Sequence, residues 1–154
     1  MKRHWQYFRY VMRHKLYVFQ ECRKIGVPIL MAILHDWDKF LPDEWIPYAE
    51  CFYAPDGTKQ YKESAAFTSA WNLHQKRNKH HWQFWLITWD RGETEALPMP
   101  DVFRREMLAD WRGAGRAING KDDTIGWYTK QRDKMILHPD TRAWIESQLG
   151  YKGE

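Results

Sequence analysis

The sequence predicts a soluble, all-α protein folded as a compact bundle of six or seven helices. Apolar residues recur at spacings of three and four, which is the helical period. Turn signals rich in proline and glycine divide the 154 residues into segments that are mostly of helical length. Alternating strand patterns are scarce. The length suits a single domain over residues 1–154, and the 44% of hydrophobic residues are enough for one core.

Three helices are predicted in the first third of the chain. The first has its apolar face at Trp5, Phe8, Met12, Leu16 and Phe19. Pro28 at a first-turn position opens the second helix, which is expected to run through Asp36 or beyond, with the stretch 30–34 buried. Pro42 opens the third, which continues toward Phe52.

The remaining helices are bounded by turn signals. A fourth spans Lys62 to Lys76, and 81–89 continues or restarts it, although a strand competes there. Pro100-Asp101 opens a helix through Trp111, and the glycines between 113 and 120 indicate a turn. Asp122 or Asp123 caps a helix running to Leu137, and a last one begins at Pro139 and ends at Gly150.

Composition narrows the class of partner and the compartment. The formal charge of +4 comes from 24 Lys and Arg against 20 Asp and Glu, so binding of small anions such as nucleotides is favoured over binding of nucleic acid. No run approaches the roughly 18 apolar residues of a membrane helix. Cys22 and Cys51 lack metal-type spacing, and the first residues do not read as a signal peptide. A cytoplasmic protein is expected.

The candidate functional residues are histidines and carboxylates. His35 and Asp36 are adjacent at the end of the predicted second helix, and Lys39 follows. The other members are His14 in the first helix, His74 in the fourth, His80-His81 just after it, and the i, i+4 pair Glu106 and Asp110. Imidazole and carboxylate suit Zn, Mn or Fe, and ligands from several helices can converge in a bundle core. A carboxylate such as Asp36 could then bridge two ions that generate hydroxide for attack on phosphorus.

Each of these residues also has a plain structural interpretation. His4 and His138 are assigned to the surface or to helix ends. Adjacent residues on a helix diverge by about 100°, so ligation by both His80 and His81 requires a helix end or a kink. Glu106 either pairs with an arginine or orients a ligand. Asp38 and Glu44 could act as a general base or hold a ligand histidine, and a helix start is the preferred interpretation of Glu44.

The order of these residues resembles the HD-domain superfamily of metal-dependent phosphohydrolases, whose signature is a His, a His-Asp pair and a later Asp. Three short motifs also resemble those of a small uncharacterised family of phages and bacteria, and this likeness runs over roughly residues 13–149. These motifs are His35-Asp-Trp-Asp-Lys39-Phe, Asn78-Lys-His-His-Trp82 and Glu106-Met-Leu-Ala-Asp-Trp111.

The resemblance implies an all-helical fold and a ligand set. It implies that a first metal is bound by His14, His35, Asp36 and Asp110. It implies that a second is bound by His74, His80 and His81, with Asp36 shared. Lys39 matches a lysine that faces the phosphate. The expected cofactor is one or two divalent ions (Mn, Fe, Zn, Co or Mg). No Gly-Tyr-Pro word follows His80-His81, so a cyclic dinucleotide substrate is not implied.

The predicted activity is metal-dependent hydrolysis of a phosphate ester in a nucleotide or deoxynucleotide, by a nucleotidase or phosphodiesterase. Asp36, Asp38 and Lys39 are the predicted catalytic residues, and Trp37, Trp82 or Trp111 could stack on a base. Cations that could meet phosphates are Arg104, Arg105, Arg112, Arg116, Lys130 and Lys134.

Three alternatives stay open. The first is a non-enzymatic protein that sequesters a nucleotide or signal molecule, for instance a phage protein directed against a host defence and acting in the host cytoplasm. The second is a nucleic-acid-binding domain that uses the basic, aromatic segment from Arg3 to Lys15. The third is an oxygen-using di-iron enzyme. The sequence leaves the oligomeric state open.

Overall fold

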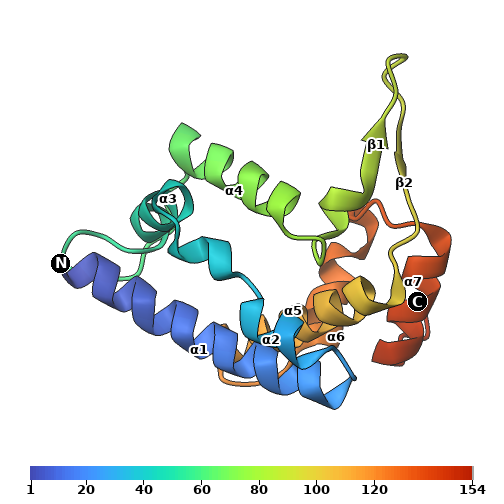
Figure 1. Ribbon diagram of the computed structural model, residues 1–154, viewed down its shortest axis with the longest axis horizontal. Helices are drawn as coiled ribbons and strands as arrows, with labels where there is room; N and C mark the ends of the chain where they lie inside the picture. The colour runs from blue at the N-terminus through green and yellow to red at the C-terminus, as the bar shows by residue number, and fades with distance from the viewer. Residues whose placement is uncertain (154) are drawn as a thin grey trace.

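The computed structural model describes residues 1–153 and shows a mostly helical protein (Figure 1). The described residues form seven α-helices, three 3-10 helices and one two-stranded hairpin. The α-helices are α1 (Lys2–Lys24), α2 (Ile29–Leu34), α3 (Pro42–Phe52), α4 (Ala65–Arg77), α5 (Asp101–Asn119), α6 (Thr124–Gln131) and α7 (Pro139–Leu149). The 3-10 helices are η1 (Trp37–Phe40), η2 (Trp82–Trp85) and η3 (Arg132–Lys134), and the strands are β1 (Leu86–Thr88) and β2 (Thr94–Ala96). The all-α prediction with six or seven helices is confirmed.

Helices α1 and α5 pack side by side and form the base of the molecule (Figure 1). Helix α5 does not stop at the glycines that predicted a turn. It runs through Gly113 and Gly115 and ends at Gly120, whose φ of 77° closes the helix in the left-handed region. An ideal Cβ on Gly113 would lie 2.5 Å from Val18 Cγ2 and 2.6 Å from Val18 N. Gly113 is therefore the point of closest approach between the two helices.

The first helix forms as predicted but buries a different face. Its inward residues are Tyr7, Val11, His14 and Val18, whereas the predicted apolar stripe from Trp5 to Leu16 faces outward. Both stripes have helical spacing, so periodicity alone could not choose between them. The choice is made by packing on α5 and by the inward position of His14.

Helix α2 is shorter and more exposed than predicted. It ends at Leu34, and Asp36 adopts a left-handed conformation with φ 54° and ψ 31°. Only Ala32 of this helix is buried, while Ile29, Leu30, Ile33 and Leu34 are exposed. The prediction that 30–34 is buried was wrong except at Ala32, because this short helix packs through one face only, with Ala32 in a cluster that includes Val18 of α1 and Ala109 of α5.

Helices α3 and α4 form a second pair above α1 (Figure 1). Helix α3 has the predicted bounds, and Tyr48 and Ala49 on it pack with Phe67 and Ala70 of α4 in one apolar cluster. Helix α4 begins three residues later than predicted, because the Ser64 hydroxyl accepts a hydrogen bond from the Phe67 amide and caps it.

The segment 81–89 is not the predicted continuation of a helix. After the short η2, β1 and β2 pair antiparallel with Leu86 opposite Ala96, and this hairpin projects from the body (Figure 1). The competing strand interpretation was correct for residues 86–88. The tripeptide Leu-Ile-Thr has the β-branched content that favours a strand.

The C-terminal helices pack on α5 in an apolar cluster. Met107, Leu108, Tyr128 and Ile145 form the buried centre of this cluster. Helix α6 ends at Gln131 and is followed by η3, short of the predicted end at 137. Helix α7 has the predicted bounds and ends at Gly150 in the left-handed region. Among the described residues, no helix combines the length and apolar character needed to cross a membrane.

The close contact at Gly113 makes a stability prediction. Gly113→Ala is expected to destabilise the protein by about 2 kcal/mol, because the added methyl overpacks the contact with Val18. Gly115→Ala is the matched control. An ideal Cβ there meets Lys121 O at 3.5 Å and Asp123 N at 3.7 Å, which are ordinary contacts, so this variant should be neutral or up to about 1 kcal/mol more stable. Urea unfolding followed by circular dichroism measures both. Equal stability of the two variants would contradict the packing argument.

Candidate metal centre

Every histidine and carboxylate predicted as a metal ligand reaches one buried region. His14 comes from α1, His74 from α4 and Asp110 from α5. The other four come from non-helical turns: His35 and Asp36 after α2, and His80 and His81 after α4. Segments that are distant in the sequence therefore supply one set of side chains.

The first ligand group surrounds one point. His14 Nε2 lies 3.1 Å from Asp36 Oδ2 and 3.3 Å from Asp110 Oδ1. His35 Nε2 lies 3.4 Å from each of the same two oxygens. Bonds of about 2.1 Å to a divalent ion put neighbouring ligand atoms about 3.0 to 3.4 Å apart, so these four atoms have the spacing of one coordination shell.

The second ligand group uses the other oxygen of Asp36. Asp36 Oδ1 lies 3.5 Å from His74 Nε2 and 3.3 Å from His80 Nε2. His81 completes this group, and one ligand atom from each of the four residues lies within 4.8 Å of all the others. Asp36 thus belongs to both groups through separate oxygens, so it would be available to two ions if both groups held one.

Unsatisfied buried atoms show that these residues fit a metal. Within the described residues, no hydrogen-bond partner is found for Asp36 Oδ1 or for the Nε2 atoms of His35, His74, His80 and His81. Buried polar atoms are nearly always paired, and an unpaired one is costly. Five such atoms around a common centre therefore match the requirements of bound cations.

Two irregular turns make this convergence possible. Asp36 is the only non-glycine residue with positive φ among the described residues, a conformation that is unfavourable for a residue with a Cβ. This turn lets His35 and Asp36 reach the same centre although they are neighbours. Helix α4 ends at Arg77, so His80 and His81 lie in a turn and avoid the divergence that a helix would impose. The helix end that ligation by both His80 and His81 was predicted to require is therefore present.

A layer of carboxylates orients the ligand histidines. His35 Nδ1 donates a hydrogen bond to Glu106 Oε1 at 3.1 Å, and His80 Nδ1 lies 3.5 Å from the same oxygen. Since an ionised carboxylate only accepts, this contact places the proton on Nδ1 and leaves the Nε2 lone pair facing the centre. Glu106 therefore orients one histidine of each ligand group. Of the two predicted roles, pairing with an arginine or orienting a ligand, the contacts support the second.

His74 is oriented in the same way by two acids. Its Nδ1 lies 3.0 Å from Asp38 Oδ2 and 2.9 Å from Glu44 Oε2. Glu44 is in the first turn of α3, as preferred from the sequence, yet its side chain is completely buried against this histidine. Arg77 donates to Glu44 Oε1 at 2.8 Å and offsets the second negative charge. Sequence patterning gave no sign of the part played by Arg77.

Lys39 lies at the edge of the first ligand group. Its ammonium donates to Asp36 Oδ2 at 2.5 Å, and the side chain is 12% exposed. Burial lowers the pKa of Lys39, but the Asp36 charge outweighs burial and holds this pKa well above its usual value. Lys39 is a permanent cation here, and its role toward a phosphate stays a prediction.

The carboxylates of the centre stay ionised. Burial raises the pKa of Asp36, but the positive charges of His35, Lys39 and His74 bring it well below its usual value. Hydrogen bonding by His35 likewise overcomes burial and lowers the pKa of Asp110. The pKa of Glu106 falls to about 2, because hydrogen bonds from His35 and His80 outweigh burial.

The histidines divide into two sets. Burial lowers the pKa values of His35 and His74, yet the charge of Asp36 raises both above the ordinary value. In His14, burial prevails and, with the Lys39 charge, lowers the pKa; in His81, burial and the neighbouring His80 lower it well below. The surrounding carboxylates thus favour positive charge at the centre, which bound cations would supply.

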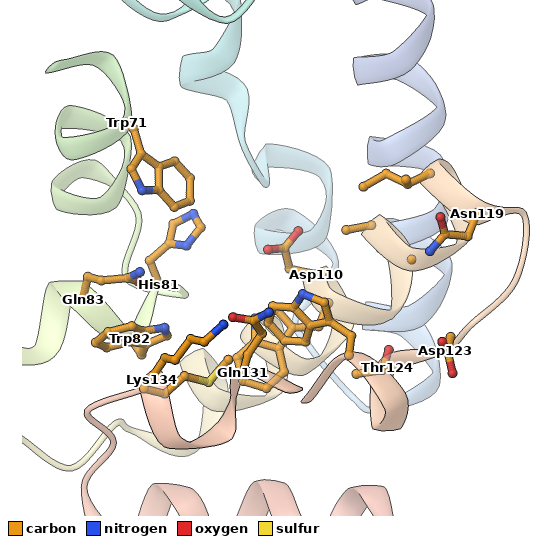
Figure 2. A pocket seen from close by; sticks show the side chains of 16 residues that line it. Trp71, His81, Trp82, Gln83, Asp110, Asn119, Asp123, Thr124, Gln131 and Lys134 are labelled. Carbon is orange, nitrogen blue, oxygen red and sulfur yellow. The ribbon is translucent and has the colours of Figure 1, made fainter. Parts of the chain in front are cut away.

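An aromatic cleft of about 400 Å³ leads to this centre (Figure 2). His81 and Asp110, one residue from each ligand group, lie at its inner wall. Its indole walls are Trp71, Trp82, Trp111 and Trp127. Polar side chains in the lining include Gln83, Asn119, Gln131 and Lys134.

Only some of the residues predicted to stack on a base or bind phosphate line the cleft. Trp82 and Trp111 line the cleft, whereas Trp37 is 56% exposed and does not. Trp71 and Trp127 were missed, because only the fold brings α4 and α6 to the same opening. Of the six predicted cations, Lys134 alone lines the cleft. Arg104 and Arg105 pair with Asp101, and Arg116 pairs with Glu21.

One protein-family model matches nearly the whole chain. It describes a family of unknown function, DUF5662, and it covers residues 3–151. No curated protein and no solved structure matches the chain. The family model names no activity, and kinship with the HD-domain superfamily stays an interpretation of the residues. Function therefore has to be argued from the centre and its cleft.

The shared carboxylate predicts metal contents that differ between variants. The purified protein loaded with Mn²⁺ or Co²⁺ should bind two ions per chain. Asp36→Ala should weaken both sites, because each ligand group loses an oxygen, whereas Asp110→Ala should weaken only the first. Elemental analysis after desalting and isothermal titration calorimetry measure this. His138→Ala, a change at the N-cap of α7, should bind like the wild type; a single site, or equal losses in both aspartate variants, would contradict the shared role of Asp36.

The outer carboxylate layer makes a separate prediction. Glu106→Gln should weaken metal binding by about 10- to 100-fold, because a neutral amide oxygen accepts from Nδ1–H of His35 and His80 less strongly than the carboxylate does. Glu146→Gln is the matched control, since Glu146 pairs with Arg132 and Tyr128 away from the centre. Titration with Co²⁺ under absorbance detection reads out affinity and ligand field together. Unchanged spectra and affinity in Glu106→Gln would refute this positioning role.

Proposed function

The chain belongs to the DUF5662 family, whose function is unknown, and we propose that this member is a metal-dependent phosphohydrolase acting on a nucleotide or deoxynucleotide. One observation carries the proposal: two groups of imidazole and carboxylate side chains share Asp36, and Asp36 Oδ1 and four of the imidazole Nε2 atoms are buried without a hydrogen-bond partner in the described residues. Paired divalent ions, when bound in such a centre, lower the pKa of water and stabilise the negative charge of an in-line displacement at phosphorus.

The surrounding side chains hold the metal-binding groups in place and supply negative charge around them. Asp36 holds the two ligand groups together, and Glu106 fixes one histidine in each of them. Such preorganisation matters because groups already aligned for a developing charge need not reorganise during the reaction. The centre is buried apart from its opening at His81 and Asp110, so bulk water is largely excluded and electrostatic interactions are strong.

Two of the predicted catalytic side chains are assigned distinct roles. Lys39 carries a permanent positive charge beside Asp36, and we assign it to the phosphoryl oxygens of the substrate. Asp38 accepts hydrogen bonds from His74 and from Asn78 Nδ2, the latter at 2.5 Å. These contacts support a positioning role for Asp38 rather than proton transfer.

The cleft supports a nucleotide as the class of substrate. Four indole rings present flat apolar surfaces on which a base can stack, and the amides of Gln83, Asn119 and Gln131 offer both donors and acceptors. Lys134 adds a cation to the same lining. A ligand with its ring between these walls would extend its phosphate toward Asp110 and His81.

Turnover of a nucleotide panel tests the proposal. With Mn²⁺ or Co²⁺ the wild type should release phosphate or a shortened nucleotide, detected by chromatography and a phosphate assay. Lys39→Ala should lower kcat/KM by about 100-fold, because a charge that stabilises the transition state is lost. His35→Ala should abolish turnover, and Lys130→Ala, an exposed cation outside the cleft, should leave it unchanged.

Two other results would replace the proposed activity. Tight nucleotide binding without release of any product would identify a sequestering protein. Oxygen consumption on loading with Fe²⁺, without phosphate release, would identify a di-iron oxidation centre. Both results keep the metal centre and contradict the hydrolysis.

A further inference from the structure

The exposed apolar side chains are concentrated on one part of the molecule. Eleven of the twenty large apolar side chains that are exposed in the described part of the chain lie between residues 5 and 46. We call these eleven the outer face: Trp5, Phe8, Met12 and Leu16 on α1, Ile29, Leu30, Ile33 and Leu34 on α2, Trp37 and Phe40 on η1, and Ile46 on α3. Neither the metal centre nor the cleft uses any of them.

The outer face is continuous across its helices. The rings of Trp5 and Phe8 lie 5.8 Å apart, and Trp45 links Phe8 to Phe40 through centroid distances of 6.5 and 5.8 Å. Lys15 Nζ donates to the Ile33 carbonyl at 3.2 Å and joins α1 to α2. Phe40, Pro42, Trp45 and Ile46 surround a shallow apolar hollow of about 330 Å³ in this face.

The outer face points away from the reaction centre. At about 100° per residue, Met12 and Leu16 lie roughly opposite His14 on α1, and His14 is the residue that reaches the metal ligands. Partner binding on this face would therefore leave the aromatic cleft open.

We propose that the outer face binds a second copy of this chain. Each of its side chains exposes on the order of 100 Å², given that large aromatic residues present about 150–250 Å² in all. The eleven together amount to roughly 1,000 Å², which exceeds the largest apolar patch of a typical monomer, about 300–600 Å². A standard interface needs about 800 Å² per partner, so this area is sufficient for a stable dimer.

The shape and composition of the face also fit a protein partner. Trp, Phe, Met and Arg are the residues enriched at protein interfaces, and here Trp5, Phe8 and Met12 are flanked by Arg9 and Arg13. The hollow can accommodate a protruding side chain. In a two-fold interface each copy contributes both the hollow and the side chain that fills the hollow of the other. A flat lipid surface has nothing to fill such a concavity.

The charges of the face allow self-association. Arg9 and Arg13 lie along one edge of α1, and the opposite edge is α2, whose residues 29–34 carry no charge. A two-fold axis parallel to α1 places the arginine edge of one copy over the α2 edge of the other. The like charges therefore do not meet, and the arginines lie at the rim of the interface, where contact with water is retained.

Light scattering after size exclusion, with sedimentation velocity at several micromolar concentrations, tests the proposal on the full chain. The wild type should show twice the monomer mass of 18.7 kDa. Ile33→Glu and Leu30→Glu should each be monomeric, because they bury a charge in the interface. Ile136→Glu is the matched control and should stay dimeric, since Ile136 is 47% exposed outside the face and Ile33 is 54% exposed within it. Far-UV circular dichroism and metal content confirm that each variant is folded.

Three outcomes would overturn the proposal. A monomeric wild type at all concentrations excludes self-association. A dimer that persists in both folded α2 variants places the interface elsewhere. A monomeric wild type that sediments with phosphatidylglycerol vesicles, and loses this property in Ile33→Glu, assigns the face to a lipid surface instead.

Discussion

The carboxylate of Asp36 is the constraint on which the rest of the structure depends. One of its oxygens lies near His14 and His35, and the other lies near His74 and His80. The residue is buried and stands in a left-handed conformation that most residues with a Cβ avoid and that aspartate adopts more readily than most. Such a position persists only where its surroundings over-determine it. Helices α1 and α4 do so by bringing His14 and His74 to these oxygens, and α5 places Asp110 against His14 and His35.

The polar centre takes the place of a single large core. Apolar residues gather in three separate clusters, and the ligand residues lie among them. Burial of so many ionisable side chains is unfavourable unless they are paired, and Lys39 and Arg77 supply only part of the compensation. Bound cations would complete it, so metal binding and folding are expected to be coupled in this protein.

The abundant aromatic residues serve two different surfaces. Trp71, Trp82, Trp111 and Trp127 wall the cleft beside the centre, whereas Trp5 and Trp37 lie on the outer face. Since α1 carries His14 on its inner side and apolar residues on its outer side, one helix separates the two surfaces. A partner on the outer face would therefore stiffen the helix that carries His14 without covering the aromatic cleft.

The sequence by itself determined the helical class, the first residues of most helices and the histidines and carboxylates that form the candidate metal centre. Proline and serine caps and terminal glycines act locally, so α3 and α7 could be predicted to the residue. The His-Asp pair and the later imidazoles and carboxylates are unusual enough in type and order to indicate a metal centre without coordinates. Tertiary structure alone decided which face of α1 is buried, because two stripes of that helix share the same period. It also decided that Gly113 lies inside a helix rather than in a turn, since only contact with Val18 makes a missing side chain useful there. The convergence of His80 with His81 and the four-tryptophan cleft likewise depend on long-range packing, which no local pattern encodes.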